Sequence, residues 1–204
     1  MLKRNIVVLA NSVKHHEHCV AGKCLSTKEW IRPVSDSTGA ELTSVQASCR
    51  NPHGLFGVKP KQKVAIGISQ HSPLVNQPEN YVVDNTEWLQ NYNIDDNQLL
   101  NYLDTPSDLW GADDRVPYEQ IVYGSIPISQ SLYLVQVDDL QLYVKDSIKR
   151  RASFSYNGNN YDLAVTDPRF DEIVSEGKGL SNILCISLGE VFANNCFKLV
   201  ATVF

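Results

Sequence analysis

Short apolar stretches, many of them with alternating polar positions, recur along most of the chain, and this pattern predicts β-strands rather than helices. In the first part of the sequence the predicted strands are 5–12, 18–25, 30–35, 63–69 and 80–84. In the last third they are 131–137, 140–146, 149–156, 159–167, 182–188 and 196–204. No fixed-period repeat relates the two groups. The layout predicts a mainly β protein with minor α structure, built as two small barrels.

The pair Asn157-Gly158 is the clearest local signal, because this dipeptide is favoured in two-residue type I′ hairpin turns. The turn fixes the register of the flanking strands, so that Phe154 opposes Tyr161. Since side chains alternate between the faces of a strand, one face is apolar and is predicted to lie in the core. Its members are Ala152, Phe154, Tyr161, Leu163 and Val165. Arg151 and Asp162 lie on the opposite face, where they are placed to pair.

Residues 86–127 are more acidic and less β-like than the rest of the chain. Asp95 and Asp96 open a segment with approximate helical spacing, and acidic residues are favourable at a helix N-terminus. We therefore expect 1–85 to form the first barrel, 86–127 a connector with one or two short helices, and 128–204 the second barrel. A further helix is expected to begin with Asp167 as N-cap and to stop near Gly177.

Composition narrows the class of protein. The chain has 204 residues, of which 43% are hydrophobic and 20% charged, and no apolar run approaches the roughly 20 residues that span a bilayer. The apolar part of the start, residues 6–10, is shorter than a signal peptide requires, so we expect a cytoplasmic protein with reduced cysteines and no membrane contact. The net charge of −5 argues against non-specific DNA binding by the whole surface, although a local basic groove stays possible.

Residues 11–24 concentrate histidines and cysteines: His15, His16, His18, Cys19 and Cys24. Zinc sites usually draw four ligands from two short-spaced pairs, and the chain has no C-x-x-C or H-x-x-x-H pair. Cys19 and Cys24 are five apart and would point to opposite faces of a strand. The favoured interpretation is loop histidines before a buried strand, with no metal. The alternative is a zinc site completed by His53 or His71.

Arg32 shares a strand face with Trp30 and Val34, so it is either a buried, ion-paired arginine or a clamp for a phosphate or carboxylate. Glu79 or Asp108 is the expected partner in the first case. Phosphate-binding loops and nucleophile elbows are absent from the sequence, so no catalytic residue or cofactor is expected.

Eight short motifs occur in a characteristic order. They are NSVK (11–14), CVAG (19–22), WIRPVS (30–35), QPENYVVD (77–84), DLW (108–110), YDLAVTDP (161–168), LCISLGEVF (184–192) and FKLVATVF (197–204). In this order, the set resembles the prokaryotic dual OB-containing domain family. The resemblance implies two OB-like barrels and, by analogy, a nucleic acid or nucleotide as partner, without a settled activity. The family pattern is matched at Asn11, Ser12, Lys14, Arg32, Glu79, Asn80 and Asp167. The histidines at 15, 16 and 18 do not match it, which counts further against zinc.

Three functions follow as hypotheses. The leading one is a non-enzymatic module that binds a nucleic acid or a phosphorylated small molecule. Lys14 and Arg32 would contact anionic groups, Asn11, Ser12 and Asn80 would orient the ligand, and Glu79 would complete the site. The second is a hydrolase or nucleotide-modifying enzyme built on Lys14, Arg32 and Glu79 with a cysteine or histidine. The third is a protein-interaction adaptor whose partner docks on the connector, near Trp88 and Trp110.

Overall fold

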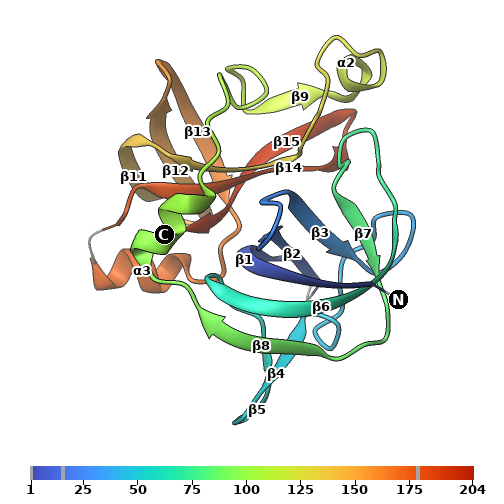
Figure 1. Ribbon diagram of the computed structural model, residues 1–204. Helices are drawn as coiled ribbons and strands as arrows, with labels where there is room; N and C mark the ends of the chain where they lie inside the picture. The colour runs from blue at the N-terminus through green and yellow to red at the C-terminus, as the bar shows by residue number, and fades with distance from the viewer. Residues whose placement is uncertain (1, 15–16, 178–179) are drawn as a thin grey trace. The chain divides into compact units, whose positions relative to one another are not determined.

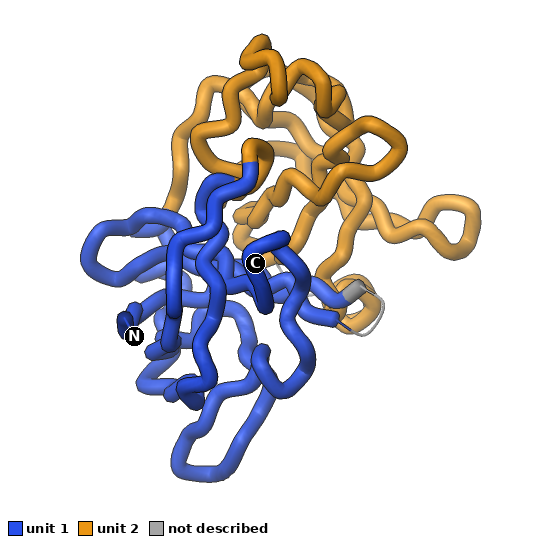
Figure 2. Tube along the Cα trace, turned by 90° about the vertical axis from the view of Figure 1, so that its right-hand side faces the viewer, with its two compact units in different colours: residues 1–74, 78–102 blue, residues 75–77, 103–204 orange. Residues whose placement is uncertain are grey.

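The computed structural model describes residues 2–14, 17–177 and 180–204, and it divides the chain into two compact units (Figures 1 and 2). Unit 1 comprises Met1–Leu74 and Pro78–Tyr102, and unit 2 comprises Val75–Gln77 and Leu103–Phe204. Strands dominate both units, which confirms the prediction of a mainly β fold. The expected connector is divided: its first part, to Tyr102, clusters with unit 1, and its remainder clusters with unit 2.

The centre of unit 1 is a closed five-stranded barrel (Figure 1). Its strands are β1 (Leu2–Lys14), β2 (Glu17–Cys24), β3 (Trp30–Val34), β6 (Gln62–His71) and β7 (Asn80–Val83). They pair in the order β1-β2-β3-β7-β6, and β6 returns to pair with β1. Every pairing is antiparallel except that of β3 with β7. This arrangement is the Greek-key barrel of an OB fold.

Apolar side chains at alternate positions fill this barrel, as the strand pattern predicted. They include Ile6, Val8, Val20, Ile31, Val64 and Ile66, all of which are almost fully buried. Between β3 and β6 the chain forms the hairpin of β4 (Ser48–Asn51) and β5 (Gly54–Gly57), and β8 (Trp88–Asn93) pairs with both β4 and β6. The unit ends with α1 (Asp96–Leu99) and a 3₁₀ turn, η1 (Leu100–Tyr102). Asp95 caps α1 in a capping box with Gln98, which confirms the helix expected there.

Unit 2 has the same topology, with one strand broken in two. Its six barrel strands are β10 (Leu132–Gln136), β11 (Asp138–Lys145), β12 (Lys149–Tyr156), β13 (Asn159–Val165), β14 (Ile183–Phe192) and β15 (Asn195–Val203). Only Val137 separates β10 from β11; β10 pairs with β14 and β11 with β12, so together they close the barrel as one strand. The pairing of β13 with β15 is parallel, like that of β3 with β7. Outside the barrel, β9 (Arg115–Pro117) pairs with β15 and leads into α2 (Tyr118–Val122).

The β12–β13 hairpin has the predicted register. Phe154 pairs with Tyr161 and Ala152 with Leu163, and Asn157 and Gly158 both have positive φ, as a type I′ turn requires. The predicted apolar face is buried in the core of unit 2. The hairpin of β12 and β13 therefore has the register and the buried face that the sequence predicted.

The helix after β13 departs from the prediction at its start. The expected helix began at Pro168 with Asp167 as its N-cap, whereas α3 (Phe170–Glu176) begins at Phe170 after Arg169, without a side-chain cap. The carboxylate of Asp167 is engaged elsewhere, because it accepts hydrogen bonds from the backbone N–H of Val203 and Arg169 and from the Arg169 guanidinium. The end was predicted correctly, since Gly177 has a left-handed φ of 57°. None of the helices among the described residues has the length and apolar character that a membrane crossing requires.

Candidate nucleic-acid interface

Three of the six predicted site residues meet where β3 runs parallel to β7. Arg32 pairs in register with Asn80, and its backbone N–H donates to the carbonyl oxygen of Glu79 at 2.9 Å. The Arg32 Nε lies 3.5 Å from Glu79 Oε1. The exposed fractions are 7% for Arg32, 7% for Glu79 and 0% for Asn80. This burial favours the ion-paired interpretation of Arg32, with Glu79 as its partner, and leaves these side chains little surface to offer a ligand.

The other three lie on the β1–β2 hairpin. Asn11 donates from Nδ2 to the carbonyl oxygen of Val58 at 2.7 Å, and its Oδ1 lies 3.3 Å from His18 Nδ1. Ser12 is half-buried, and the backbone of Lys14 pairs with Glu17 at the end of β1. The six predicted residues are therefore divided between two places in unit 1. Their role in ligand binding stays a prediction.

The histidine and cysteine cluster is only partly within the described residues, because His15 and His16 lie outside them. His18 Nε2 lies 3.4 Å from Ser44 Oγ, and Cys19 Sγ lies 3.6 Å from Glu41 Oε1. Within residues 2–14, 17–177 and 180–204, no group of three or more His, Cys, Asp or Glu side chains is arranged to hold a metal ion.

In OB folds the outer face of the second and third barrel strands, with the adjoining loops, binds oligonucleotides and oligosaccharides. In unit 1 these strands are β2 and β3. A row of paired residues crosses their outer face, namely Val7, Lys23 and Trp30, with exposed fractions of 0%, 4% and 5%. The Lys23 Nζ donates to the carbonyl oxygen of Tyr102 at 2.8 Å and lies 5.2 Å from the Trp30 ring centre. This row is buried and offers no polar surface.

The corresponding strands of unit 2, β12 and β13, carry a polar and partly exposed outer face. Its side chains alternate with the core positions along β12 and β13. Tyr143 of the neighbouring strand β11 pairs with Arg151 of β12 and extends the face. We call it the unit 2 outer face, and it comprises Tyr143, Arg151, Ser153, Ser155, Asn160 and Asp162.

A hydrogen-bond network orders this face. Arg151 Nε donates to Asp162 Oδ1 at 2.9 Å, and the Tyr143 hydroxyl donates to Asp162 Oδ2 at 2.8 Å. Partial burial alone would raise the pKa of Asp162, but the hydrogen bonds from Arg151 and Tyr143 outweigh it and lower that pKa. The hydrogen bond to Asp162 in turn raises the pKa of Tyr143. Asp162 therefore stays ionised and holds the Arg151 guanidinium in place.

The neighbouring basic residues are also paired with acids. Lys149 Nζ lies 2.9 Å from Asp146 Oδ2, and Arg150 forms an ion pair with Asp171. The aromatic residues of this hairpin are buried, which confirms the interpretation of Phe154 and Tyr161 as core. The pairing of Arg151 with Asp162 was also predicted correctly.

The face continues across β15 to β9. Ala164 pairs with Leu199, and Phe197 lies two residues earlier on the same side of β15. On β9, Arg115 pairs with Phe197 of β15, and the guanidinium carbon of Arg115 lies 4.5 Å from the centre of the Phe197 ring. Arg115 Nε is 2.7 Å from Asp114 Oδ1, and the Arg115 side chain is 46% exposed. Sequence reasoning missed Arg115 and Phe197, because the long-range pairings that bring them to this face leave no local signal.

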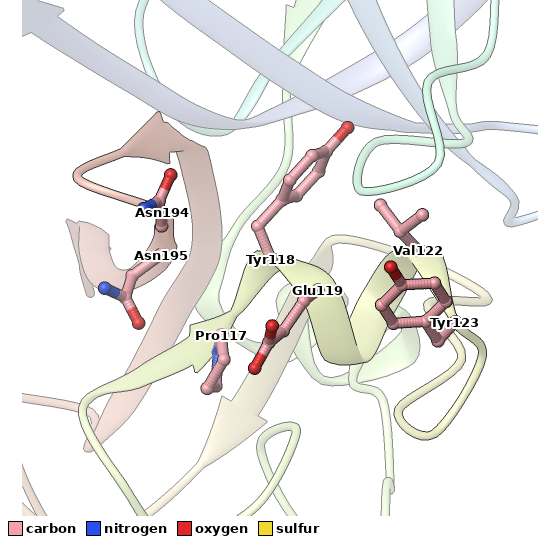
Figure 3. Close-up of a pocket in the computed structure, with 7 residues that line it drawn as sticks. All are labelled: Pro117, Tyr118, Glu119, Val122, Tyr123, Asn194 and Asn195. Carbon is pink, nitrogen blue, oxygen red and sulfur yellow. The ribbon is translucent and has the colours of Figure 1, made fainter.

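A cavity of about 560 Å³ lies beyond the end of β9 (Figure 3). The β9–β15 pairing connects it to the unit 2 outer face, since Pro117 pairs with Asn195 two residues from the Arg115–Phe197 pair. Its lining residues are Pro117, Tyr118, Glu119, Val122, Tyr123, Asn194 and Asn195.

Charge is unevenly divided between the units. Unit 1 carries ten Lys and Arg residues against nine Asp and Glu, and unit 2 carries eight against fourteen. A ligand of the unit 2 outer face therefore meets individual arginines in an acidic surrounding, and broad electrostatic attraction contributes little there.

Two barrels of OB topology in one chain define a dual-barrel protein. The sequence model of the family described as "Dual OB-containing domain" matches residues 4–203, and the chain belongs to this family. The resemblance in the ordered motifs is thereby confirmed. No relative with a curated description matches the chain.

Two solved structures are similar at low identity. One is titled "Structure of murine DNA binding protein bound with ds DNA"; it has 11% identity and a TM-score of 0.38, and the match covers 100% of this chain and 97% of that one. The other, "Crystal structure of the tetrameric p202 HIN2", has 10% identity and a TM-score of 0.34, with coverage of 100% and 92%. Similarity at this level carries no argument about function.

Proposed function

We propose that the protein is a non-enzymatic binding module that takes single-stranded nucleic acid across the unit 2 outer face. The observation that carries the proposal is the contrast between the barrels. The outer face of β12 and β13 is polar and accessible, whereas the equivalent row in unit 1 is buried. In OB folds this surface is the usual place for an oligonucleotide.

The side chains suit a flexible single strand. Arg151 is held by one edge of its guanidinium, and a planar guanidinium both binds phosphate and stacks on bases. Arg115 lies over Phe197, so a cation and an aromatic ring are presented together. Lys145 is exposed at the end of β11, beside the turn that leads into β12. Stacking on aromatic rings beside basic groups is the usual way to bind single strands without sequence preference.

The acidic balance of unit 2 shapes the expected binding. Lys145, Arg115 and Arg151 supply about three phosphate contacts, so the logarithm of the binding constant should fall with the logarithm of salt concentration with a slope of about −2. We expect modest affinity, dominated by stacking and by these few contacts.

The six site residues predicted in unit 1 have a secondary role in this proposal. The parallel pairing of β3 with β7 would be stabilised by Arg32, Glu79 and Asn80. A nucleotide or phosphorylated small molecule would bind only at the end of the β1–β2 hairpin, through Asn11, Ser12 and Lys14. Unchanged affinity of Arg32→Ala for every ligand that binds would remove Arg32 from the binding site.

The test is fluorescence anisotropy with labelled 12-mers of DNA and RNA, in single-stranded and duplex form, at two salt concentrations. We expect Arg115→Ala and Arg151→Ala each to weaken single-strand binding about tenfold, since one stacking or phosphate contact is of that size. Arg50→Ala is the matched control, because Arg50 is an exposed arginine paired with Glu87 in unit 1. Circular dichroism of each variant checks folding. Absence of single-strand binding by the wild type at low salt, or an equal loss in Arg50→Ala, would overturn the proposal.

A further inference from the structure

The cavity at the end of β9 has a chemistry different from that of the unit 2 outer face. Its described lining residues include no Lys or Arg. They supply two phenol rings, from Tyr118 and Tyr123, two carboxamides, from Asn194 and Asn195, and one carboxylate, from Glu119. A phosphate would be repelled by this carboxylate, whereas a flat, uncharged ligand with N–H donors is complementary to the set.

The backbone fixes the two sides of the cavity. The Tyr118 N–H donates to the Asn194 carbonyl oxygen at 2.9 Å, which ties the start of α2 to the β14–β15 turn. Asn195 Nδ2 donates to the carbonyl oxygen of Ala193 at 2.8 Å, so its Oδ1 is the atom available to accept from a ligand. Figure 3 shows the two asparagines on one side and Tyr123 on the other, with Tyr118 and Glu119 between them.

Two side chains are free to meet a ligand. Tyr123 is 83% exposed, so its ring offers a face for stacking at no cost in core packing. In the part of the chain that the structure describes, Glu119 has no ion-pair partner, and both carboxylate oxygens can accept hydrogen bonds.

We propose that this cavity takes one nucleobase with an exocyclic amino group, and guanine in preference to the others. Guanine presents two adjacent donors, N1–H and N2–H, which match the two oxygens of the Glu119 carboxylate. Cytosine and adenine present only the amino group on this edge, and thymine and uracil present a single N3–H, so none of them offers two adjacent donors from neighbouring positions. The cavity volume is ample for a base with its sugar. The proposal rests on the proposed function, because the base would come from a strand that lies on the unit 2 outer face.

The strand pairing supports this path. Arg115 and Pro117 lie on one side of β9, and they pair with Phe197 and Asn195 of β15. A strand held at the Arg115–Phe197 pair therefore reaches the cavity two residue pairs further on, at Pro117 and Asn195. The outer face would supply most of the affinity, and the cavity would supply the base preference.

The test uses labelled oligo(dT) 12-mers that carry one central dG, dC or dA, compared with the all-dT strand. We expect the dG strand to bind about tenfold more tightly than all-dT, with dC and dA close to all-dT, because a bidentate contact to a base discriminates by about this factor. Glu119→Gln should remove most of the dG advantage and change the all-dT affinity much less. Glu172→Gln, which removes an exposed carboxylate on α3, is the matched control and should preserve the advantage. Tyr123→Ala should weaken the dG strand more than all-dT.

The outcomes separate the two proposals. If all-dT binds and Arg115→Ala weakens it, but the dG advantage is absent or survives Glu119→Gln, the base cavity is overturned and the proposed function stands. If no strand binds, the proposed function fails, and titration of free guanosine followed by NMR decides the cavity. Saturable shifts that are lost in Glu119→Gln would support it, and absence of shifts would overturn it.

Discussion

The Nζ of Lys198 lies 2.7 Å from the carbonyl oxygen of Gly111 at the end of the unit 2 barrel. Lys198 stands on β15 between Cys196 and Val200, two core residues, so its side chain follows the inward positions of the strand. It is 1% exposed and lies 5.5 Å from the centre of the Tyr161 ring. A lysine in such a position is a titratable group built into the core.

Burial lowers the pKa of Lys198 from its ordinary 10.5 to about 8, although Asp108, Asp113 and Asp114 favour the charged form. Below pH 8 both folded and unfolded chains hold the proton. Between pH 8 and 10.5 the folded chain releases it while the unfolded chain keeps it, so the free energy of unfolding rises with pH. From pH 7 to 9.5 this group should contribute an increase of roughly 2 kcal/mol.

The measurement is the difference in unfolding free energy between the wild type and Lys198→Met over this pH range. Other titrating groups are common to both proteins, and burial raises the pKa values of Tyr133 and Tyr156, which moves their titration above the range. A difference that does not change with pH, or that changes in the opposite direction, would contradict the assignment.

Gly22 of β2 pairs with Val8 of β1, and a side chain at this position would meet the backbone of β1. A Cβ there would lie 2.2 Å from the carbonyl oxygen of Val7 and 2.9 Å from its carbon. Because the obstacle is backbone inside a closed barrel, Gly22→Ala should destabilise the protein by about 3 kcal/mol or more. Gly57→Ala is the matched control on β5, where a Cβ would meet nothing within 4 Å, and it should change stability by less than about 1 kcal/mol. The free energy of unfolding of both variants is measured by urea denaturation. Equal values would show that the barrel backbone moves to accommodate a Cβ at Gly22.

Asp167 and Asp36 occupy equivalent positions after the third strand of each barrel, and both accept a hydrogen bond from the backbone N–H two residues later. Asp36 is exposed, whereas Asp167 is 1% exposed and also binds the Val203 N–H and the Arg169 guanidinium. Asp167→Ala leaves a buried donor without its acceptor and should cost about 3 kcal/mol, whereas Asp36→Ala removes hydrogen bonds at an exposed site and should cost less. Thermal unfolding of the two variants tests the difference, and a larger loss for Asp36→Ala would refute it.

The same pair shows what local pattern predicts and what it misses. The strands and the Asn157-Gly158 register are set by neighbours in sequence, so they were predictable. The two barrels were also predicted, but no internal repeat between them was recognised, although Val34-Ser35-Asp36 and Val165-Thr166-Asp167 end equivalent strands. The segments that follow differ in kind, a β-hairpin in unit 1 and α3 in unit 2, and this removes any fixed period. The N-cap expectation failed because Asp167 bonds a strand more than thirty residues away.

The candidate interface was less accessible to sequence reasoning. Arg115 falls in a segment that reads as a loop, and it reaches the unit 2 outer face only through the pairing of β9 with β15. Trp88 and Trp110 suggested a docking surface, but their exposed fractions are 3% and 6%. Their burial removes the apolar patch that the adaptor hypothesis needs. Glu79 and Asp108 were the two expected partners of Arg32, and Glu79 is the one that lies beside it. The local sequence could not choose between them, because the choice depends on the parallel pairing of β3 with β7.

Cys24 provides a prediction about reactivity. Burial alone would raise its pKa, but hydrogen bonds from Ser26 and Thr27 outweigh this and bring the pKa of Cys24 to about 7. The Sγ lies 3.3 Å from Ser26 Oγ. Since the thiolate is the nucleophile, alkylation of Cys24 by iodoacetamide should follow a pH profile with its midpoint near 7. The absolute rate should be low, because Cys24 is only 4% exposed. Burial raises the pKa of Cys196 to about 11, so that thiol should stay unmodified at neutral pH and serves as an internal control.

Ser26→Ala removes the hydrogen bond and should move the Cys24 midpoint upward, which slows alkylation at pH 7 several-fold. Thr27→Ala is the companion variant, because Thr27 also contributes hydrogen bonds to the thiolate and should act in the same direction. Peptide mass spectrometry after timed alkylation gives the rate at each cysteine separately. If the Cys24 midpoint lies near 9 in the wild type and does not change in Ser26→Ala, the turn that follows β2 does not stabilise the thiolate.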